Sequence, residues 1–171
     1  IGVGMIENYV YIINPNDGSI RRKVPVNVSP LTPPIVGKNG TIYIGIHGME
    51  KEEHIRLFAV NPNGTHKWSF ATVGRLARTP LMGDDGTIYV GCLRGFFYAV
   101  NPDGTEKWRL ELGEPVIEGN PVIGYDGTIY VACWENLYAI RSDSGGLATD
   151  APWPKYQRDY RNSGRYQEIG D

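Results

Sequence analysis

The chain of 171 residues is 41% hydrophobic and 21% charged, which is ordinary for a folded globular protein. Its formal net charge is -2, so it lacks the basic excess with which proteins bind nucleic acids or anionic membranes. No apolar run approaches the about 20 residues that a membrane-spanning helix needs. We therefore expect no nucleic-acid partner and no membrane insertion.

One string, Gly-Thr-Ile-Tyr, occurs three times and marks a repeating unit. The copies span 40–43, 86–89 and 127–130, at spacings of 46 and 41 residues. Each unit contains segments rich in β-branched and aromatic residues, separated by short clusters of Gly, Pro, Asn and Asp, which indicates four short strands. Units of this length are typical of β-propeller blades. The sequence therefore predicts an all-β propeller of four-stranded antiparallel blades.

The unit that begins at Pro80 has no insertion and gives the pattern most clearly. We expect its four strands at 80–82, 87–92, 96–100 and 105–110. The segment 101–104, Asn-Pro-Asp-Gly, fits a type I turn position by position. Asp84, Asp85 and Asp126 lie in turns, where a short carboxylate satisfies neighbouring backbone groups without a metal ion.

Counting strands predicts an incomplete ring. The chain opens on the second to fourth strands of a blade, continues with two whole blades, and ends on a first, second and third strand. This makes fourteen strands, about three and a half blades, in the repeats 1–31, 32–76, 77–117 and 118–141. Because closed propellers have about four to eight blades, we expect either further blades upstream or a second copy of the chain to close the ring.

The repeats resemble the blades of the pyrroloquinoline-quinone-type, or quinoprotein-like, β-propeller family. The motif that carries the resemblance runs from Ala through Asn-Pro and Gly-Thr to Trp, at 59–68 and 99–108, beside the strand motif Asp-Gly-Thr-Ile-Tyr-Val. The resemblance covers roughly residues 1–141. It implies that Trp68 and Trp108 stack between blades and hydrogen-bond to a neighbouring blade through the ring nitrogen.

The first and last repeats depart from this motif. Arg21, Arg22 and Lys23 stand where the first repeat would carry its Trp, and the last repeat has none. After the last blade, residues 142–171 form an irregular tail. Its segment 151–165 resembles one found at the chain ends of secreted bacterial and archaeal propellers of the family. This implies a secreted, periplasmic or cell-surface protein whose tail lies against the last blade and covers an open edge.

No catalytic constellation is recognisable. Many quinone-dependent dehydrogenases of the family carry adjacent cysteines over the cofactor, whereas Cys92 and Cys133 are 41 residues apart, in the same register of successive repeats. We interpret them as packing residues, because equivalent sites on adjacent blades are usually too far apart for a disulfide. The three histidines lack the paired spacing of a zinc site. We therefore expect no cofactor and no metal, and assign no catalytic residue.

Two features could concern a ligand. Asn120 precedes a strand that would line the central channel, and Thr79 and Pro33 fill its register in the other blades. We interpret this register as variable channel lining, with a ligand contact at Asn120 as the alternative.

The second feature is a longer loop between the second and third strands of the second repeat. Gly45 to Ala59 is 14 residues and the equivalent Gly91 to Ala99 is 8, so the loop has six extra residues. Insertions in repeat proteins gather on the binding face. The candidate partner residues in this loop are His47, Met49, Glu50, Glu52, Glu53 and His54. The alternative is a solvated charged loop without a binding role.

Together these features predict a non-enzymatic propeller scaffold that presents loops for protein or glycan binding outside the cytoplasm. Two alternatives remain open. One is a fragment of a quinone-dependent dehydrogenase, and the other is a sugar-binding or sugar-cleaving propeller.

Overall fold

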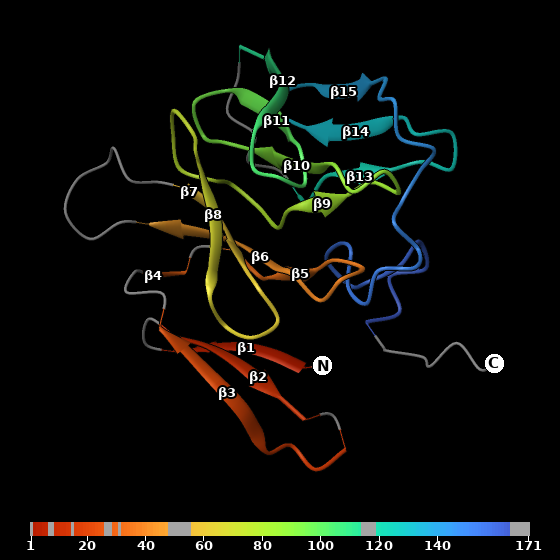
Figure 1. Ribbon diagram of the computed structural model, residues 1–171. Helices are drawn as coiled ribbons and strands as arrows, with labels where there is room; N and C mark the ends of the chain where they lie inside the picture. Colours follow the sequence, from red (N-terminus) through yellow and green to blue (C-terminus); the bar gives the residue numbers. More distant parts are fainter. Residues whose placement is uncertain are drawn as a thin grey trace.

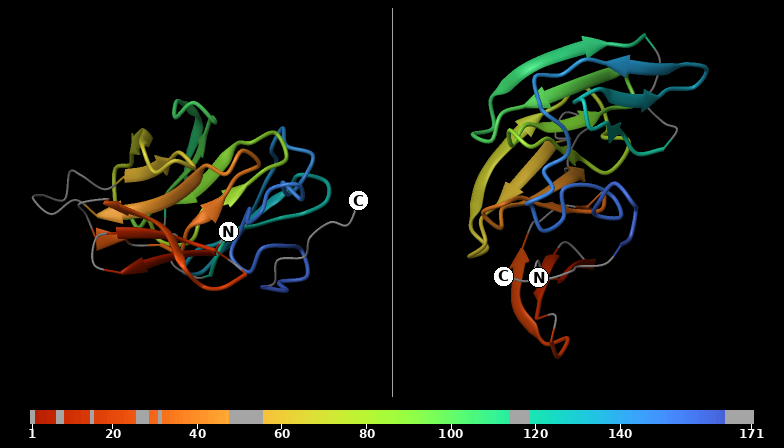
Figure 2. Two further views of the ribbon diagram at one scale, coloured as in Figure 1. Left: turned by 60° about the horizontal axis from the view of Figure 1, so that its bottom comes forward. Right: turned by 90° about the vertical axis from the view of Figure 1, so that its right-hand side faces the viewer.

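A computed structural model describes residues 2–6, 9–14, 16–25, 29–30, 32–47, 56–113 and 119–164. All regular elements in these ranges are β-strands, arranged in four antiparallel sheets. The sheets follow one another in chain order as a fan, from red through orange and green to teal (Figures 1 and 2). The prediction of successive antiparallel propeller blades is confirmed. Within the described ranges, nothing has the length and apolarity of a helix that could cross a membrane.

The four sheets are named blades I to IV. Blade I contains β1 (Gly2–Ile6), β2 (Tyr9–Ile13) and β3 (Ile20–Pro25). Blade II contains β4 (Ser29–Pro30), β5 (Ile35–Val36), β6 (Ile42–His47), β7 (Arg56–Val60) and β8 (His66–Ala71). Blade III contains β9 (Leu81–Met82), β10 (Ile88–Gly91), β11 (Phe96–Val100) and β12 (Glu106–Glu111). Blade IV contains β13 (Val122–Ile123), β14 (Ile129–Ala132) and β15 (Leu137–Ile140).

The first strand of blade II is split in two, which brings the strands in the described ranges to fifteen instead of the predicted fourteen. β4 pairs with one end of β6 and β5 pairs with the other. Pro33 and Pro34 lie between them, and proline has no N–H to donate to the ladder. Blade III has the same interruption before Pro80, where an isolated bridge between Leu76 and Cys92 stands in place of a strand.

The predicted Asn-Pro-x-Gly turns close as expected and set the register of the outer strands. The amide nitrogens of Gly64 and Gly104 donate to the carbonyls of Asn61 and Asn101, at 2.8 and 2.9 Å. Both glycines have a positive φ, 85° and 91°, which L-residues with side chains rarely adopt. A type I turn followed by such a glycine shifts the pairing by one residue. The shift is present beside Ala59 and beside Ala99.

Each pair of neighbouring blades encloses its own apolar core. The forward face of a blade is here the face turned toward the next blade in the chain. The forward face of blade III, with Leu81, Tyr89 and Phe97, packs on Ile129 and Val131 of blade IV. Similar clusters lie between blades II and III and between blades I and II. Cys92 and Cys133 are buried in two different cores and form no disulfide, in agreement with their interpretation as packing residues.

Trp68 bridges blades II and III. Its ring nitrogen donates to the carbonyl of Pro102 at 3.0 Å. Its ring lies over Gly104, where a Cβ atom would come within 2.7 Å of the indole. Trp108 packs on Tyr89 and Phe97, and among the described residues none accepts a hydrogen bond from its ring nitrogen.

Arg22 occupies the equivalent position in blade I. It pairs with Ile12 across the sheet, as Trp68 pairs with Ala59 in blade II. Its guanidinium donates to the carbonyl of Asn63, and its side chain lies over Gly64. Arg22 therefore makes a contact between blades I and II of the kind that the family resemblance implies for Trp.

Candidate functional site: a central pocket

The candidate partner loop lies mostly outside the described residues. The backbone of His47 forms the end of β6. Met49, Glu50, Glu52, Glu53 and His54 are outside the described ranges. The role of this loop in partner binding stays a prediction.

A pocket of about 250 Å³ opens where the inner strands of three blades begin. Blade II contributes Thr32 and Pro33, which precede β5. The other lining residues come from blade III, blade IV and the tail: Ala77, Arg78, Thr79, Asn120 and Tyr156. Thus the register that the sequence singled out, that of Pro33, Thr79 and Asn120, meets in one pocket at the centre of the fan. Both interpretations of this register, variable channel lining and a ligand contact at Asn120, stay predictions.

Proline places these residues. Pro34, Pro80 and Pro121 each follow a residue of the pocket register, and the residue before a proline is held extended. The hydroxyl of Thr32 accepts a hydrogen bond from Gly45 N at 2.9 Å. A Cβ atom on Gly45 would lie 2.7 Å from the Thr32 methyl group, which explains why this position carries no side chain.

Asn120 links blade IV to blade III within the pocket. Its side-chain oxygen accepts a hydrogen bond from the backbone nitrogen of Thr79 at 3.1 Å. Because the partner is an N–H group, the oxygen of the amide must face it and the NH₂ group points elsewhere. No residue that the structure describes accepts a hydrogen bond from this NH₂ group.

The tail forms one wall of the pocket. In Figures 1 and 2 it is the blue segment that leaves β15 and returns past blades III and II. Val36 and Trp153 exchange backbone hydrogen bonds of 2.7 and 3.1 Å, and Met82 N donates to Pro154 O at 2.8 Å. These bonds satisfy the inner edges of β5 and β9, which would otherwise offer unpaired backbone groups to the channel. The tail also contacts the last blade, where the Tyr160 hydroxyl donates to Gly124 O at 3.3 Å.

Lys155 folds the tail beside Tyr156. Its side chain is buried, and its ammonium donates to the carbonyls of Tyr156 and Asp159, at 2.8 and 3.2 Å, and to the side-chain oxygen of Asn162. Burial lowers the pKa of Lys155, and the nearby Asp159 carboxylate opposes that shift. The three oxygens compensate the buried charge. They thereby hold the segment 155–162 in one conformation, from which the exposed Tyr156 ring projects.

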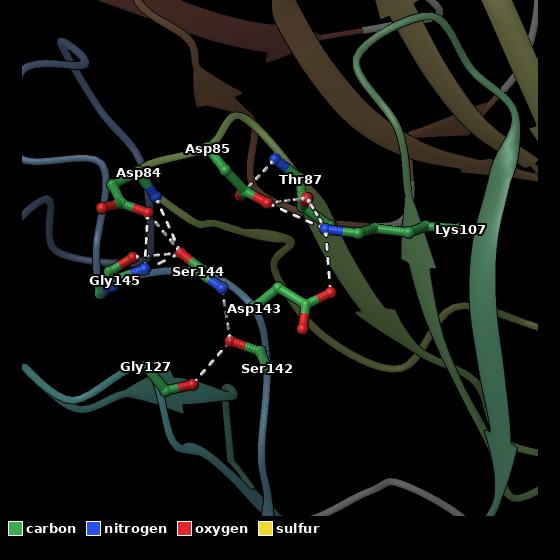
Figure 3. A network of polar contacts seen from close by, with 10 residues as sticks. Asp84, Asp85, Thr87, Lys107, Gly127, Ser142, Asp143, Ser144 and Gly145 are labelled. Carbon is green, nitrogen blue, oxygen red and sulfur yellow. Dashed lines mark hydrogen bonds and ion pairs between the residues drawn. The ribbon is translucent and has the colours of Figure 1, made fainter.

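A second polar network lies at the opposite ends of the inner strands, in the turns between β9 and β10 and between β13 and β14 (Figure 3). Asp84 accepts hydrogen bonds from Ser144 Oγ at 2.7 Å and Gly145 N at 2.8 Å. These bonds join the turn of blade III to the chain that follows β15, as Figure 3 displays.

Asp85 belongs to the same network. Burial by itself raises the pKa of Asp85, but hydrogen bonds from Thr87 and from the Lys107 ammonium, 3.0 Å away, bring it below its usual value. Both aspartates are thus engaged by protein groups. Across the described residues, no group of three His, Cys, Asp or Glu side chains could hold a metal ion.

The fold places the chain among the β-propellers. It resembles BamB from Moraxella catarrhalis, with a TM-score of 0.64 and 22% identity over 78% of this chain and 40% of that one. BBS1N, crystallised in complex with ARL6DN, gives 0.58 and 17% over 79% and 45%. A europium-containing methanol dehydrogenase gives 0.60 and 14% over 74% and 34%.

These likenesses concern the fold alone. The chain spans less than half the length of each of the three propellers. No protein-family model matches the sequence, and no curated protein matches it either. Membership of the quinoprotein-like family therefore stays a prediction.

Sequence reasoning found Asn120, Thr79 and Pro33 but missed Arg78 and Tyr156. Arg78 directly precedes Thr79, so the repeat alignment could have extended the pocket register by one residue. Tyr156 gives no such signal, because the path of the tail across blades III and II depends on backbone pairing that the sequence does not encode locally.

Proposed function

We propose that this chain is a non-enzymatic β-propeller scaffold that binds a protein or glycan partner outside the cytoplasm. The binding site is the central pocket, together with the loops around it. The observation that carries the proposal is the pocket itself, where three rigid blades bring Pro33, Thr79 and Asn120 together at one register.

The pocket is suited to binding a partner because its backbone and its lining side chains have separate roles. Prolines and inner strands hold the backbone, while the side chains at the shared register differ from blade to blade. Such positions can change chemically without disturbing the cores between the blades. A related fold gives support from another direction, since the BBS1N propeller was crystallised in complex with ARL6DN.

The location outside the cytoplasm rests on the resemblance of residues 151–165 to the chain ends of secreted propellers. Immunolocalisation of the protein in its source cells tests it. Retention in the cytoplasm would contradict this part of the proposal.

The binding role is tested by screening the chain against a displayed peptide library and a glycan array. We expect ligands whose binding falls when Asn120→Ala or Tyr156→Ala is introduced. Ile20→Ala, at an exposed position in blade I, is the control and should leave binding unchanged. Ligands that are insensitive to both pocket variants, or the absence of ligands, would contradict the proposal.

A second assay addresses enzymatic activity. The chain is incubated with pyrroloquinoline quinone and calcium, and reduction of a dye is followed with a series of alcohols. The scaffold proposal expects no turnover above that of the free quinone. Turnover that depends on the protein would replace it with the dehydrogenase alternative.

A further inference from the structure

We infer that the central pocket binds a carboxylate group, an inference that rests on the proposed binding function and specifies its chemistry. The pocket lining includes side chains that can donate hydrogen bonds and one positively charged side chain, and its described residues include no Asp or Glu. A carboxylate is the common biological group that only accepts hydrogen bonds and carries a negative charge.

The first donor is the NH₂ group of Asn120. Its partner oxygen is occupied by Thr79 N at 3.1 Å, which fixes the orientation of the amide. Because the amide oxygen already has a partner, the NH₂ donor is the group of Asn120 that is left without one among the described residues. The hydroxyl groups of Thr79 and Tyr156 can turn to donate as well.

The positive charge comes from Arg78. Its side chain is exposed and lines the pocket beside Thr79. A guanidinium carries five donors in a planar fork, so a contact with the protein leaves others for a ligand. The fork matches the two oxygens of a carboxylate, and such charge-assisted bonds are the strong ones. No Asp or Glu stands among the lining residues that the structure describes.

The size of the pocket limits the ligand. At about 250 Å³ it is smaller than the roughly 300 to 1,000 Å³ of pockets that enclose drug-sized ligands. This volume suits one acidic side chain or a small organic acid. A neutral sugar is less well matched, because its hydroxyl groups both donate and accept, and the amide oxygen of Asn120 is already used.

Two sources can supply the carboxylate: an acidic residue of a partner protein or a free small acid. The experiment is an NMR titration of the ¹⁵N-labelled full chain, which follows the side-chain NH₂ signal of Asn120 and the amide signal of Thr79. The probes are succinate, a short peptide with one central Glu between glycines and with acetylated and amidated ends, the same capped peptide with Gln, and methyl glucoside.

We expect the Asn120 and Thr79 signals to shift with succinate or with the Glu peptide, and to stay in place with the Gln peptide. A shift with the peptide alone identifies a protein carboxylate, and a shift with succinate alone identifies a small acid. Arg78→Gln should weaken the apparent affinity about tenfold or more, because a charge-assisted hydrogen bond is lost. Arg78→Lys, which keeps the charge without the fork, should fall in between.

Arg75→Gln is the matched control, because Arg75 is exposed on the same connection but does not line the pocket. It removes the same charge and should leave the affinity within about twofold, since exposed charges are screened by solvent and salt. Equal losses for the two variants would overturn the inference in favour of a diffuse charge effect.

The outcomes separate this inference from the proposed function. Equal shifts with the Glu and Gln peptides, or a shift with methyl glucoside alone, overturn the carboxylate and leave the pocket as a binding site. If none of the four probes shifts Asn120 while pocket-dependent ligands emerge from the library or array, the carboxylate is again wrong. If no probe shifts the Asn120 signal and the screens give no ligand that depends on the pocket, both proposals are wrong.

Discussion

Blades III and IV present the same forward face from the same register, yet one is buried and the other is open. Three side chains of blade III are fully buried against the next sheet: Leu81, Tyr89 and Phe97. Their counterparts in blade IV are 43%, 39% and 70% exposed: Val122, Tyr130 and Leu137. The equivalence follows from the pairing, because Tyr89 faces Leu81 and Tyr130 faces Val122 across their strands.

The difference separates what a repeat determines from what its neighbour determines. The repeat fixes which residue types point forward, and blade IV has an apolar forward face like the others. Only the presence of another sheet converts that face into a core. The open face of blade IV is therefore the place where a further blade or a second copy of the chain would dock if the ring closes, which stays a prediction.

We expect the largest effect from truncating the two equivalent tyrosines, which tests most directly whether the forward faces of blades III and IV differ in burial. Tyr89→Ala should lower the free energy of unfolding by about 3 to 5 kcal/mol, since it removes a large buried ring and leaves a cavity. Tyr130→Ala should cost less than about 1 kcal/mol, because water already reaches much of the side chain. Urea denaturation followed by circular dichroism measures both. Equal losses would mean that the forward face of blade IV is covered in solution.

The interblade tryptophans extend the comparison to hydrogen bonds. We propose that Trp68 docks blade II on blade III through Pro102 O. Trp68→Phe keeps most of the ring contact but removes the donor, and should cost about 0.5 to 1.5 kcal/mol. Trp108→Phe should cost less than half of that, because blade IV ends in Arg141 and Ser142, without the Asn-Pro-x-Gly turn that supplies the acceptor.

The same denaturation assay measures the tryptophan variants. Arg22→Met is the companion variant in blade I, where Arg22 donates to the carbonyl of Asn63. Arg22→Met should lower the free energy of unfolding by about as much as Trp68→Phe does if Arg22 takes the docking role. A loss at Trp108 as large as that at Trp68 would contradict the part assigned to the turn.

Much of this arrangement could be predicted from sequence because the information is local. The Asn-Pro-x-Gly turns, the Gly-Thr-Ile-Tyr strands and the prolines each specify their own few residues, so the blades and their order followed directly. The convergence of Pro33, Thr79 and Asn120 was also within reach, since repeats rotate about a common axis.

Long-range contacts escaped prediction for the opposite reason. The role of Arg22 depends on a register shift that places Arg, and not its neighbours, opposite Ile12. The wall formed by Tyr156 depends on the pairing of the tail with Val36 and Met82, more than 70 residues earlier in the chain. Neither contact leaves a local pattern.

As the pH falls, the turns of blades III and IV should lose different amounts of stabilisation. Hydrogen bonds lower the pKa of both Asp85 and Asp126 in the folded chain, where they outweigh burial at Asp85 and where the bond from Thr128 N is the main cause at Asp126. A carboxylate whose folded pKa is depressed stabilises the fold above its unfolded pKa, and this contribution is lost as pH falls through the folded pKa.

Of the two, Asp85 also has a lysine partner, Lys107 at 3.0 Å, whereas blade IV has no fourth strand among the described residues to carry one. Between about pH 5 and pH 3, Asp85→Asn should therefore reduce the loss of stability more than Asp126→Asn does. The difference should stay below about 1 kcal/mol, as is usual for partly exposed pairs. In a chain that carries Lys107→Met, the effects of Asp85→Asn and Asp126→Asn on stability should become more similar. An unchanged difference between these effects would contradict the role of the lysine.

The smallest effect on stability concerns the open face itself. Leu137→Lys should change the free energy of unfolding by no more than about 0.5 kcal/mol, because its side chain is largely in water. If a second copy docks on blade IV, the same change should shift sedimentation from dimer to monomer, since a buried unpaired ammonium is costly. Ile20→Lys, at an exposed position on β3 of blade I, adds the same charge elsewhere and should leave the dimer intact. A wild-type chain that sediments as a monomer at all concentrations would instead favour closure by further blades of a longer protein, because the apolar face would then have no copy to cover it.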